Sequence, residues 1–121
     1  MNIISEVKAE RKRQIVSEGY TPEHDDLHVT EALMQAALCY EANAMGWDAV
    51  RRKDGAPANW PWEASSWKPK DKRRDLVRAA ALCLAEQERW VRDGFPPQAF
   101  TDTVFNRIIK QLQALDGVVN T

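Results

Sequence analysis

The chain has 121 residues, 44% of them hydrophobic, so it is long enough for one domain with a packed core. Charged residues make up 29% and the formal net charge is −1, a balance that gives no support for non-specific binding to nucleic acids or membrane surfaces. No signal peptide and no apolar run of about 18 residues is recognisable, so we expect a cytoplasmic protein without a membrane partner.

Residues 3–18 predict a first helix that ends before Gly19, because glycine favours helix C-termini. Its apolar side chains are expected to face the core, and they are Ile3, Ile4, Val7, Ile15 and Val16. Glu10, Arg11 and Arg13 lie near its middle. Charged residues three or four positions apart on a helix most often form exposed pairs. We therefore expect these three on the surface.

A dense acidic segment follows Thr21-Pro22, a pair that is typical of a helix start. The residues that carry its charge or metal-binding groups are Glu23, Asp25, Asp26, His28 and Glu31. Acids in a first helical turn are favoured by the helix dipole, which explains them without a ligand. Their density also suits a cation: carboxylate oxygens match Mg²⁺ or Mn²⁺, and an imidazole matches Mn²⁺. The sequence leaves both interpretations open.

Residues 28–45 predict a second helix, because apolar side chains recur at helical spacing from Leu33 to Ala44. His28, Glu31 and Gln35 form a polar stripe on another side of this helix. Such a stripe normally faces solvent. Here it is also placed to meet an acid of the central helix described below.

Residues 46–69 form a long connection that is rich in Trp and Pro. Connections of this length are often functional, and the aromatic content argues against disorder. We expect the Trp-Pro-Trp segment to fold over the helices as part of the core. In the alternative interpretation, Trp60 or Trp62 stacks on a nucleotide base while Lys68 holds a phosphate.

The central helix is predicted at about residues 70–92. Helix-forming residues dominate it, and every residue in 79–85 is apolar, so other helices must surround it. Asp75 on such a helix needs a partner, and Arg78 lies one turn further on. Cys39 and Cys83 both fall in apolar helical runs, which is typical of reduced core cysteines.

Residues 101–116 predict a final helix with one strong apolar face. That face is expected to pack on the central helix or on a second copy of the chain, so we expect a homodimer. No segment predicts a β-strand. We therefore predict a single all-α domain over residues 1–121, a compact bundle of four to five helices around the central helix.

The charged residues suggest phosphate chemistry. Glycine-rich phosphate loops and nucleophile motifs are absent from the sequence. Acids with Arg and Lys nearby suit metal-assisted hydrolysis of a phosphoanhydride. Asp75 and Glu86 are three turns apart, ~16 Å, too far to share one metal. Asp75 is therefore paired with Glu31 as the catalytic metal site, with Arg74 and Arg78 facing the phosphates.

A set of short strings carries a resemblance: ERKRQ, EGYTPEHDD, WPW, WKP and RRDLVRAAALCLAE. Together they resemble a small helical protein family of bacteriophages and prophages. More distantly, the chain is similar to MazG-like all-α nucleoside triphosphate pyrophosphohydrolases, which bind Mg²⁺ through ExxE on one core helix and ExxD on the next. Here the later motif falls at residues 75–78, with Arg78 in the place of an acid. The nearest match to the earlier motif is at residues 28–31.

The resemblance implies a nucleotide-binding protein in the cytoplasm of a bacterial host. Its implied Mg²⁺ or Mn²⁺ ligands are Glu31 and Asp75, helped by Asp25, Asp26 and His28. Three functions remain open from sequence. One is release of pyrophosphate from a nucleoside triphosphate. Another is a non-catalytic phage accessory protein that sequesters a nucleotide signal or inhibits a host defence protein. The last is a plain helical interaction module.

Overall fold

The computed structural model describes residues 2–18, 32–47 and 50–117. Within these ranges the chain forms helices α1 (Ile3–Glu18), α3 (Ala32–Met45), α4 (Lys72–Arg92) and α5 (Ala99–Leu115), with a single 3-10 turn, η1 (Ala64–Ser66). The described ranges contain no strand, and the nearest feature is an isolated bridge between Arg51 and Pro57. The predicted all-α fold is confirmed, and the bounds of the predicted helices differ by a few residues at most where both ends are described.

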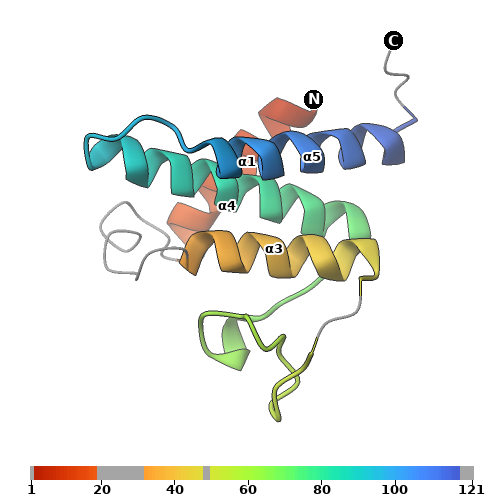
Figure 1. Ribbon diagram of the computed structural model, residues 1–121. Coiled ribbons are helices and arrows are strands. Elements are labelled where there is room, and N and C mark those ends of the chain that lie inside the picture. Colours follow the sequence, from red (N-terminus) through yellow and green to blue (C-terminus); the bar gives the residue numbers. More distant parts are fainter. Residues whose placement is uncertain (1, 19–31, 48–49, 118–121) are drawn as a thin grey trace.

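Helix α4 is the centre of the bundle, as predicted. It lies between α3 and α5, and α1 crosses behind it (Figure 1). The connection from α3 to α4 extends on the side of α3 that faces away from α5 (Figure 1). No helix in the described part of the chain is long and apolar enough to cross a membrane.

Local signals in the sequence explain where α4 begins and ends. Asp71 precedes its first turn, and the carboxylate accepts a hydrogen bond of 2.8 Å from the backbone N–H of Arg74. Gly94 follows the helix with φ of 87°, a conformation that glycine adopts at little cost. Between these ends, small side chains at Ala79, Ala80 and Ala81 are fully buried, which lets neighbouring helices approach closely.

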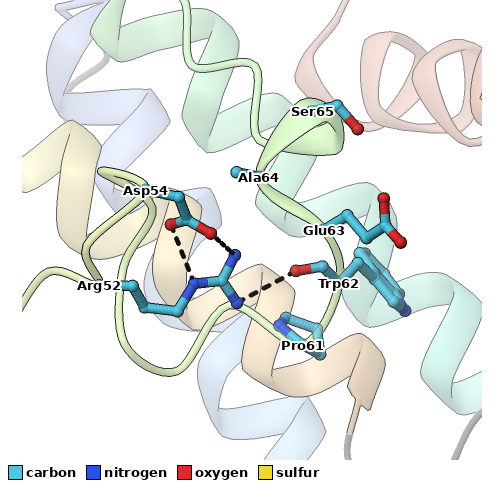
Figure 2. A pocket seen from close by; sticks show the side chains of 7 residues that line it. All are labelled: Arg52, Asp54, Pro61, Trp62, Glu63, Ala64 and Ser65. Atoms are coloured by element: carbon cyan, nitrogen blue, oxygen red, sulfur yellow. Dashed lines mark hydrogen bonds and ion pairs between the residues drawn. The ribbon is translucent and has the colours of Figure 1, made fainter.

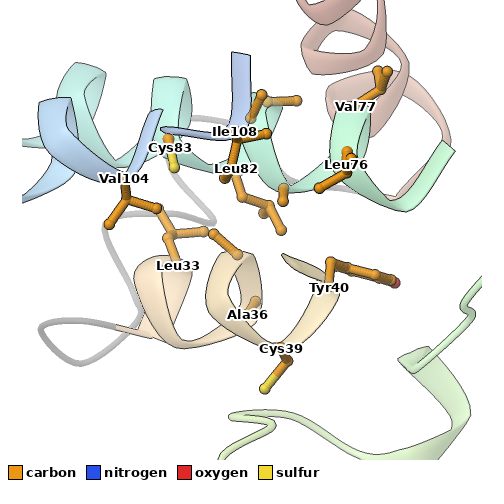
Figure 3. Packing of buried hydrophobic residues seen from close by; sticks show 14 of the residues in the cluster. Leu33, Ala36, Cys39, Tyr40, Leu76, Val77, Leu82, Cys83, Val104 and Ile108 are labelled. Atoms are coloured by element: carbon orange, nitrogen blue, oxygen red, sulfur yellow. The ribbon is translucent and has the colours of Figure 1, made fainter. Parts of the chain in front are cut away.

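The apolar core is formed where α3, α4 and α5 meet. Figure 3 shows Leu33 of α3, Leu82 of α4 and Ile108 of α5 in one cluster. Cys39 and Cys83 are free and buried, as expected from their apolar surroundings. The apolar face of α5 packs on α4, as the sequence predicts. Dimerisation through that helix stays a prediction.

Helix α1 corrects the orientation that we expected from its apolar residues. Val16 is 76% exposed, while Glu10 is only 1% exposed, and Arg11 and Gln14 are also buried. The reason is that α1 turns a polar stripe toward α4. Arg74 of α4 donates to Glu10, which also accepts two hydrogen bonds of 2.7 Å from Arg13. Glu10 and Arg11 are therefore buried rather than exposed, and Glu10 joins α1 to α4 through Arg74.

Further ion pairs attach α1 along the length of α4. Arg73 binds Glu6 at 2.6 Å, near the start of both helices. Further along α4, Glu88 binds Arg11 at 2.8 Å. Val7 is the fully buried apolar residue of α1. Ion pairs and hydrogen bonds therefore contribute to the contact between α1 and α4 along both helices.

Candidate functional site

Asp75, the predicted catalytic acid, is fully buried near the start of α4. One carboxylate oxygen accepts a 2.7 Å hydrogen bond from the backbone N–H of Lys70, and the other accepts 3.0 Å from the Asn43 side chain. Arg78, the partner expected from sequence, instead donates to the backbone carbonyl of Lys68. Its guanidinium carbon lies 5.7 Å from the centre of the Tyr40 ring. The positive charge of Arg78 nevertheless lowers the pKa of the Asp75 carboxyl.

The surroundings of Asp75 do not fit a divalent cation. Both of its oxygens face N–H donors, whereas a bound cation is surrounded by oxygen acceptors. Among residues 2–18, 32–47 and 50–117, no three His, Cys, Asp or Glu side chains lie close enough together to hold a metal ion. The other predicted metal ligands lie outside the described residues, and they are Asp25, Asp26, His28 and Glu31. The Mg²⁺ or Mn²⁺ site stays a prediction.

The predicted phosphate-binding residues are only partly brought together. Lys68 and Arg78 meet beside Asp75, but the contact uses the backbone carbonyl of Lys68. The lysine side chain itself is exposed. Arg74 points away from this group, toward α1, where it binds Glu10. A phosphate at this end of α4 would therefore compete with an existing ion pair for Arg74.

The burial of Asp75 predicts a characteristic pH dependence of stability. Burial raises the pKa of this carboxyl above its ordinary 3.8, and hydrogen bonds from Lys70 and Asn43 partly oppose the rise. The folded protein then binds this proton more tightly than the unfolded chain does. The stability that protonated Asp75 contributes is therefore present in full below pH 3.8 and is lost as the pH rises through the raised pKa. In urea unfolding, the free energy of unfolding of the wild type minus that of Asp75→Asn should fall as the pH rises through this range. A difference that is constant with pH would contradict the prediction.

Trp60 is part of the core, as the first of the two interpretations of the Trp-rich connection expects for this residue. It is 2% exposed and contacts three aromatic rings, with centroid distances of 5.4 Å to Tyr40, 5.2 Å to Trp62 and 4.9 Å to Trp67. Its indole N–H donates to the carbonyl of Glu63 at 3.2 Å. A nucleotide base has no access to a ring enclosed in this way.

Trp62, the second predicted base-stacking residue, is half-buried beside an open hollow of about 760 Å³ (Figure 2). Arg52 is the cationic residue that lines this hollow. Its guanidinium binds both oxygens of Asp54, at 3.1 and 3.0 Å, and donates to the carbonyls of Trp60 and Trp62. Because these contacts use most of its N–H groups, Arg52 holds the loop together and is poorly placed to bind a phosphate.

A more enclosed cavity of about 380 Å³ lies between three helices, and we call it the α3–α4–α5 pocket. Its volume is in the range of small-molecule sites. Three of its lining residues come from α3, two from α4, and the remainder from the start of α5 and the residue before it. They are Met34, Gln35, Leu38, Glu86, Trp90, Gln98, Phe100 and Thr101. Most of the lining is apolar, with a few polar groups that are able to orient a ligand.

Among the described lining residues of this pocket, Glu86 carries the charge, and its hydrogen bonding is incomplete. The side chain is 2% exposed, and one carboxylate oxygen accepts a 2.5 Å hydrogen bond from Arg89. The other oxygen, Oε2, has no hydrogen-bond partner among the described residues. Buried acceptors are nearly always paired, because an unpaired one loses its hydration without compensation. Glu86 therefore lines the cavity and also has a buried carboxylate oxygen without a partner among the described residues.

Hydrogen bonds fix one edge of the pocket. The side-chain oxygen of Gln87 accepts 2.8 Å from the backbone N–H of Gln98, and its amide nitrogen donates to the Gln98 carbonyl at 3.0 Å. The same nitrogen donates to Asp102 at 2.7 Å. These contacts tie the last turns of α4 to the start of α5. The α4 and α5 sides of the pocket are thus held together by hydrogen bonds.

Sequence reasoning recognised Glu86 as an acid on the central helix but did not place it in a binding site. The available signal was an acid on a helix with apolar residues on all sides, followed three positions later by Arg89. The rest of the lining comes from elements far apart in the chain. Comparison of the chain with protein-family models, curated proteins and solved structures finds no match.

Proposed function

We propose that this protein binds a nucleotide or nucleotide-derived signal in the α3–α4–α5 pocket and does not hydrolyse it. The observation that carries the proposal is the buried Glu86 carboxylate, with one unpaired oxygen, in the lining of a cavity of about 380 Å³. Trp90 and Phe100 offer aromatic surface for a flat base. The sugar and phosphates would extend toward solvent. This role corresponds to a protein that sequesters or senses its ligand.

Pyrophosphohydrolysis, which the MazG resemblance implies, has less support from the described residues. Asp75 is enclosed by hydrogen-bond donors, and Arg78 occupies the place of the second acid in its motif. A hydrolytic site would have to be completed by residues outside the described ranges, Glu31 above all. We therefore keep hydrolysis as the second proposal.

Thermal unfolding with a panel of nucleotides and cyclic nucleotides, with and without Mg²⁺, tests the first proposal. A ligand that binds only the folded state raises the melting temperature by mass action. We expect at least one nucleotide to stabilise the protein without Mg²⁺. Chromatography of the same samples should show the ligand unchanged. Stabilisation that requires Mg²⁺, with formation of a monophosphate and pyrophosphate, would instead support hydrolysis.

A variant pair locates the binding. Gln35→Trp places a large side chain at an exposed position of the pocket lining, so it should block the ligand without disturbing the core. Asn106→Trp adds the same side chain at an exposed position on α5 outside this pocket. The proposal requires that the first variant loses stabilisation by the ligand and that the second retains it. Equal stabilisation of both variants would place the ligand elsewhere, and no stabilisation by any nucleotide would reject the proposal.

Inhibition of a host defence protein, the other non-catalytic role, is favoured by one observation. Val91, Phe95 and Phe100 are exposed around the turn between α4 and α5. Exposed apolar residues that gather in one place often mark a contact surface for another protein. If no nucleotide binds, this surface becomes the candidate interface.

A further inference from the structure

We infer that the ligand presents a neutral N–H donor, carried on a flat aromatic ring, to the free oxygen of Glu86. In chemical terms this is a nucleobase whose amino group or ring N–H faces the carboxylate. The inference rests on the proposed function, because it assumes that the α3–α4–α5 pocket is the binding site. It adds the chemical class of the group that Glu86 recognises.

The charges around Glu86 argue for a neutral donor. Arg89 binds the carboxylate at 2.5 Å, and the two side chains are almost fully buried, so the negative charge is already balanced. A ligand ammonium would bring a second cation next to Arg89. A ligand carboxylate or phosphate would meet the charge of Glu86 and would have no donor to offer its free oxygen. A neutral N–H group satisfies that oxygen and adds no charge.

Within the described ranges, Asp93 is a second acid that contacts Arg89, and it does not change the conclusion. It lies 3.7 Å from the Arg89 guanidinium, and its side chain is about half exposed. Solvent screens a charge in that position far more than the buried charge of Glu86. Asp93 therefore helps to hold Arg89 from the outside, and Glu86 is the acid that lines the pocket among the residues that the structure describes.

The apolar part of the lining argues for a flat ring. Trp90, Phe100 and Met34 line the same cavity as Glu86, so a group that reaches the carboxylate is surrounded by aromatic and thioether surface. The Trp90 ring is held in place on two sides. The Arg89 guanidinium carbon lies 4.9 Å from its centre, and Phe95 meets it edge to face with centroids 5.3 Å apart. A base stacking here meets a preorganised wall.

The test compares a base with its methyl-blocked counterpart on the unaltered protein. The best binder among adenosine, guanosine, cytidine and uridine is titrated by calorimetry, beside the same nucleoside with its base N–H donors methylated. Adenosine against N6,N6-dimethyladenosine is one such pair. We expect the blocked form to bind roughly 10- to 100-fold more weakly, because a hydrogen bond to a charged acceptor is lost. No variant is needed, so the result does not depend on whether a mutant folds.

Glu86→Gln provides the matching change on the protein side. This variant removes the negative acceptor but keeps the size of the side chain, so the preference for the unblocked base should fall to less than about threefold. The outcomes separate the two claims. Equal binding of both bases to the wild type, abolished by Gln35→Trp, would overturn this inference and leave the proposed function standing. No detectable binding of any nucleoside or nucleotide would overturn both.

Discussion

Replacing Arg107 with methionine is expected to lower the free energy of unfolding by about 3 kcal/mol. Glu41 of α3 is fully buried, and Arg107 of α5 binds both of its oxygens, at 2.8 and 2.6 Å. Without that guanidinium, the hydrogen bond from Gln111, at 2.9 Å, is the one that the described residues still give this carboxylate. Its charge is then left uncompensated in the interior. The value is set at the lower end for a broken buried pair because the Arg107 side chain is itself 43% exposed.

The matched control removes both charges. Exchanging Glu41 and Arg107 together for methionine leaves no buried charge, so the double variant should be more stable than Arg107→Met alone. Urea denaturation followed by circular dichroism gives the three free energies. If Arg107→Met is as stable as the wild type, Glu41 does not depend on this pair, and the contact between α3 and α5 must be held by the apolar core.

Trp60→Ala is the second substitution with a large expected effect, a loss of about 3–5 kcal/mol. The indole fills the space between the connection and α3, in contact with Tyr40, Trp62 and Trp67. Its removal leaves a large cavity beside Tyr40 and Trp67, which stack on each other at 4.8 Å but both lose the indole contact. Since domains of this kind are stable by about 5–15 kcal/mol in total, the variant should unfold at a much lower urea concentration.

Trp62→Ala serves as the comparison, because Trp62 belongs to the same segment but is half-buried. Its loss should cost clearly less than the loss of Trp60. The comparison also bears on function. A Trp60→Ala protein that keeps its stability and loses nucleotide binding would restore the base-stacking role that its burial argues against.

The helices could be predicted from sequence because their signals are local. The run of apolar and helix-forming residues gave α4, and the glycine that follows Arg92 by two positions marks where it ends. Side-chain spacing also predicted the face of α5 that packs on α4. Trp60 followed the more general rule that aromatic residues in an ordered connection are usually buried. Each of these inferences needs only neighbouring residues.

The orientation of α1 could not be predicted because its cause is distant in the chain. Glu10 is buried since Arg74 reaches it from α4, 64 positions away in the sequence. Periodicity ranks a glutamate as a surface residue whatever its partner. The same limit hid the candidate site. The sequence pointed to Asp75, which proves to be enclosed by Asn43 and the backbone of Lys70, whereas the pocket at Glu86 is formed by side chains from three helices.

The two buried cysteines can report, through their reactivity, which part of the protein opens. Only a thiolate reacts readily with alkylating reagents, and burial raises the pKa of Cys39 to about 11 and that of Cys83 to about 12. Cys83 is enclosed by the bundle, whereas Cys39 lines a hollow that it shares with Val50 and Pro57 of the connection. Modification of Cys39 alone would therefore register the connection lifting from an intact bundle, and modification of Cys83 would register separation of the helices. Mass spectrometry of the alkylated chain distinguishes the two events by peptide, and no cysteine has to be introduced by mutation.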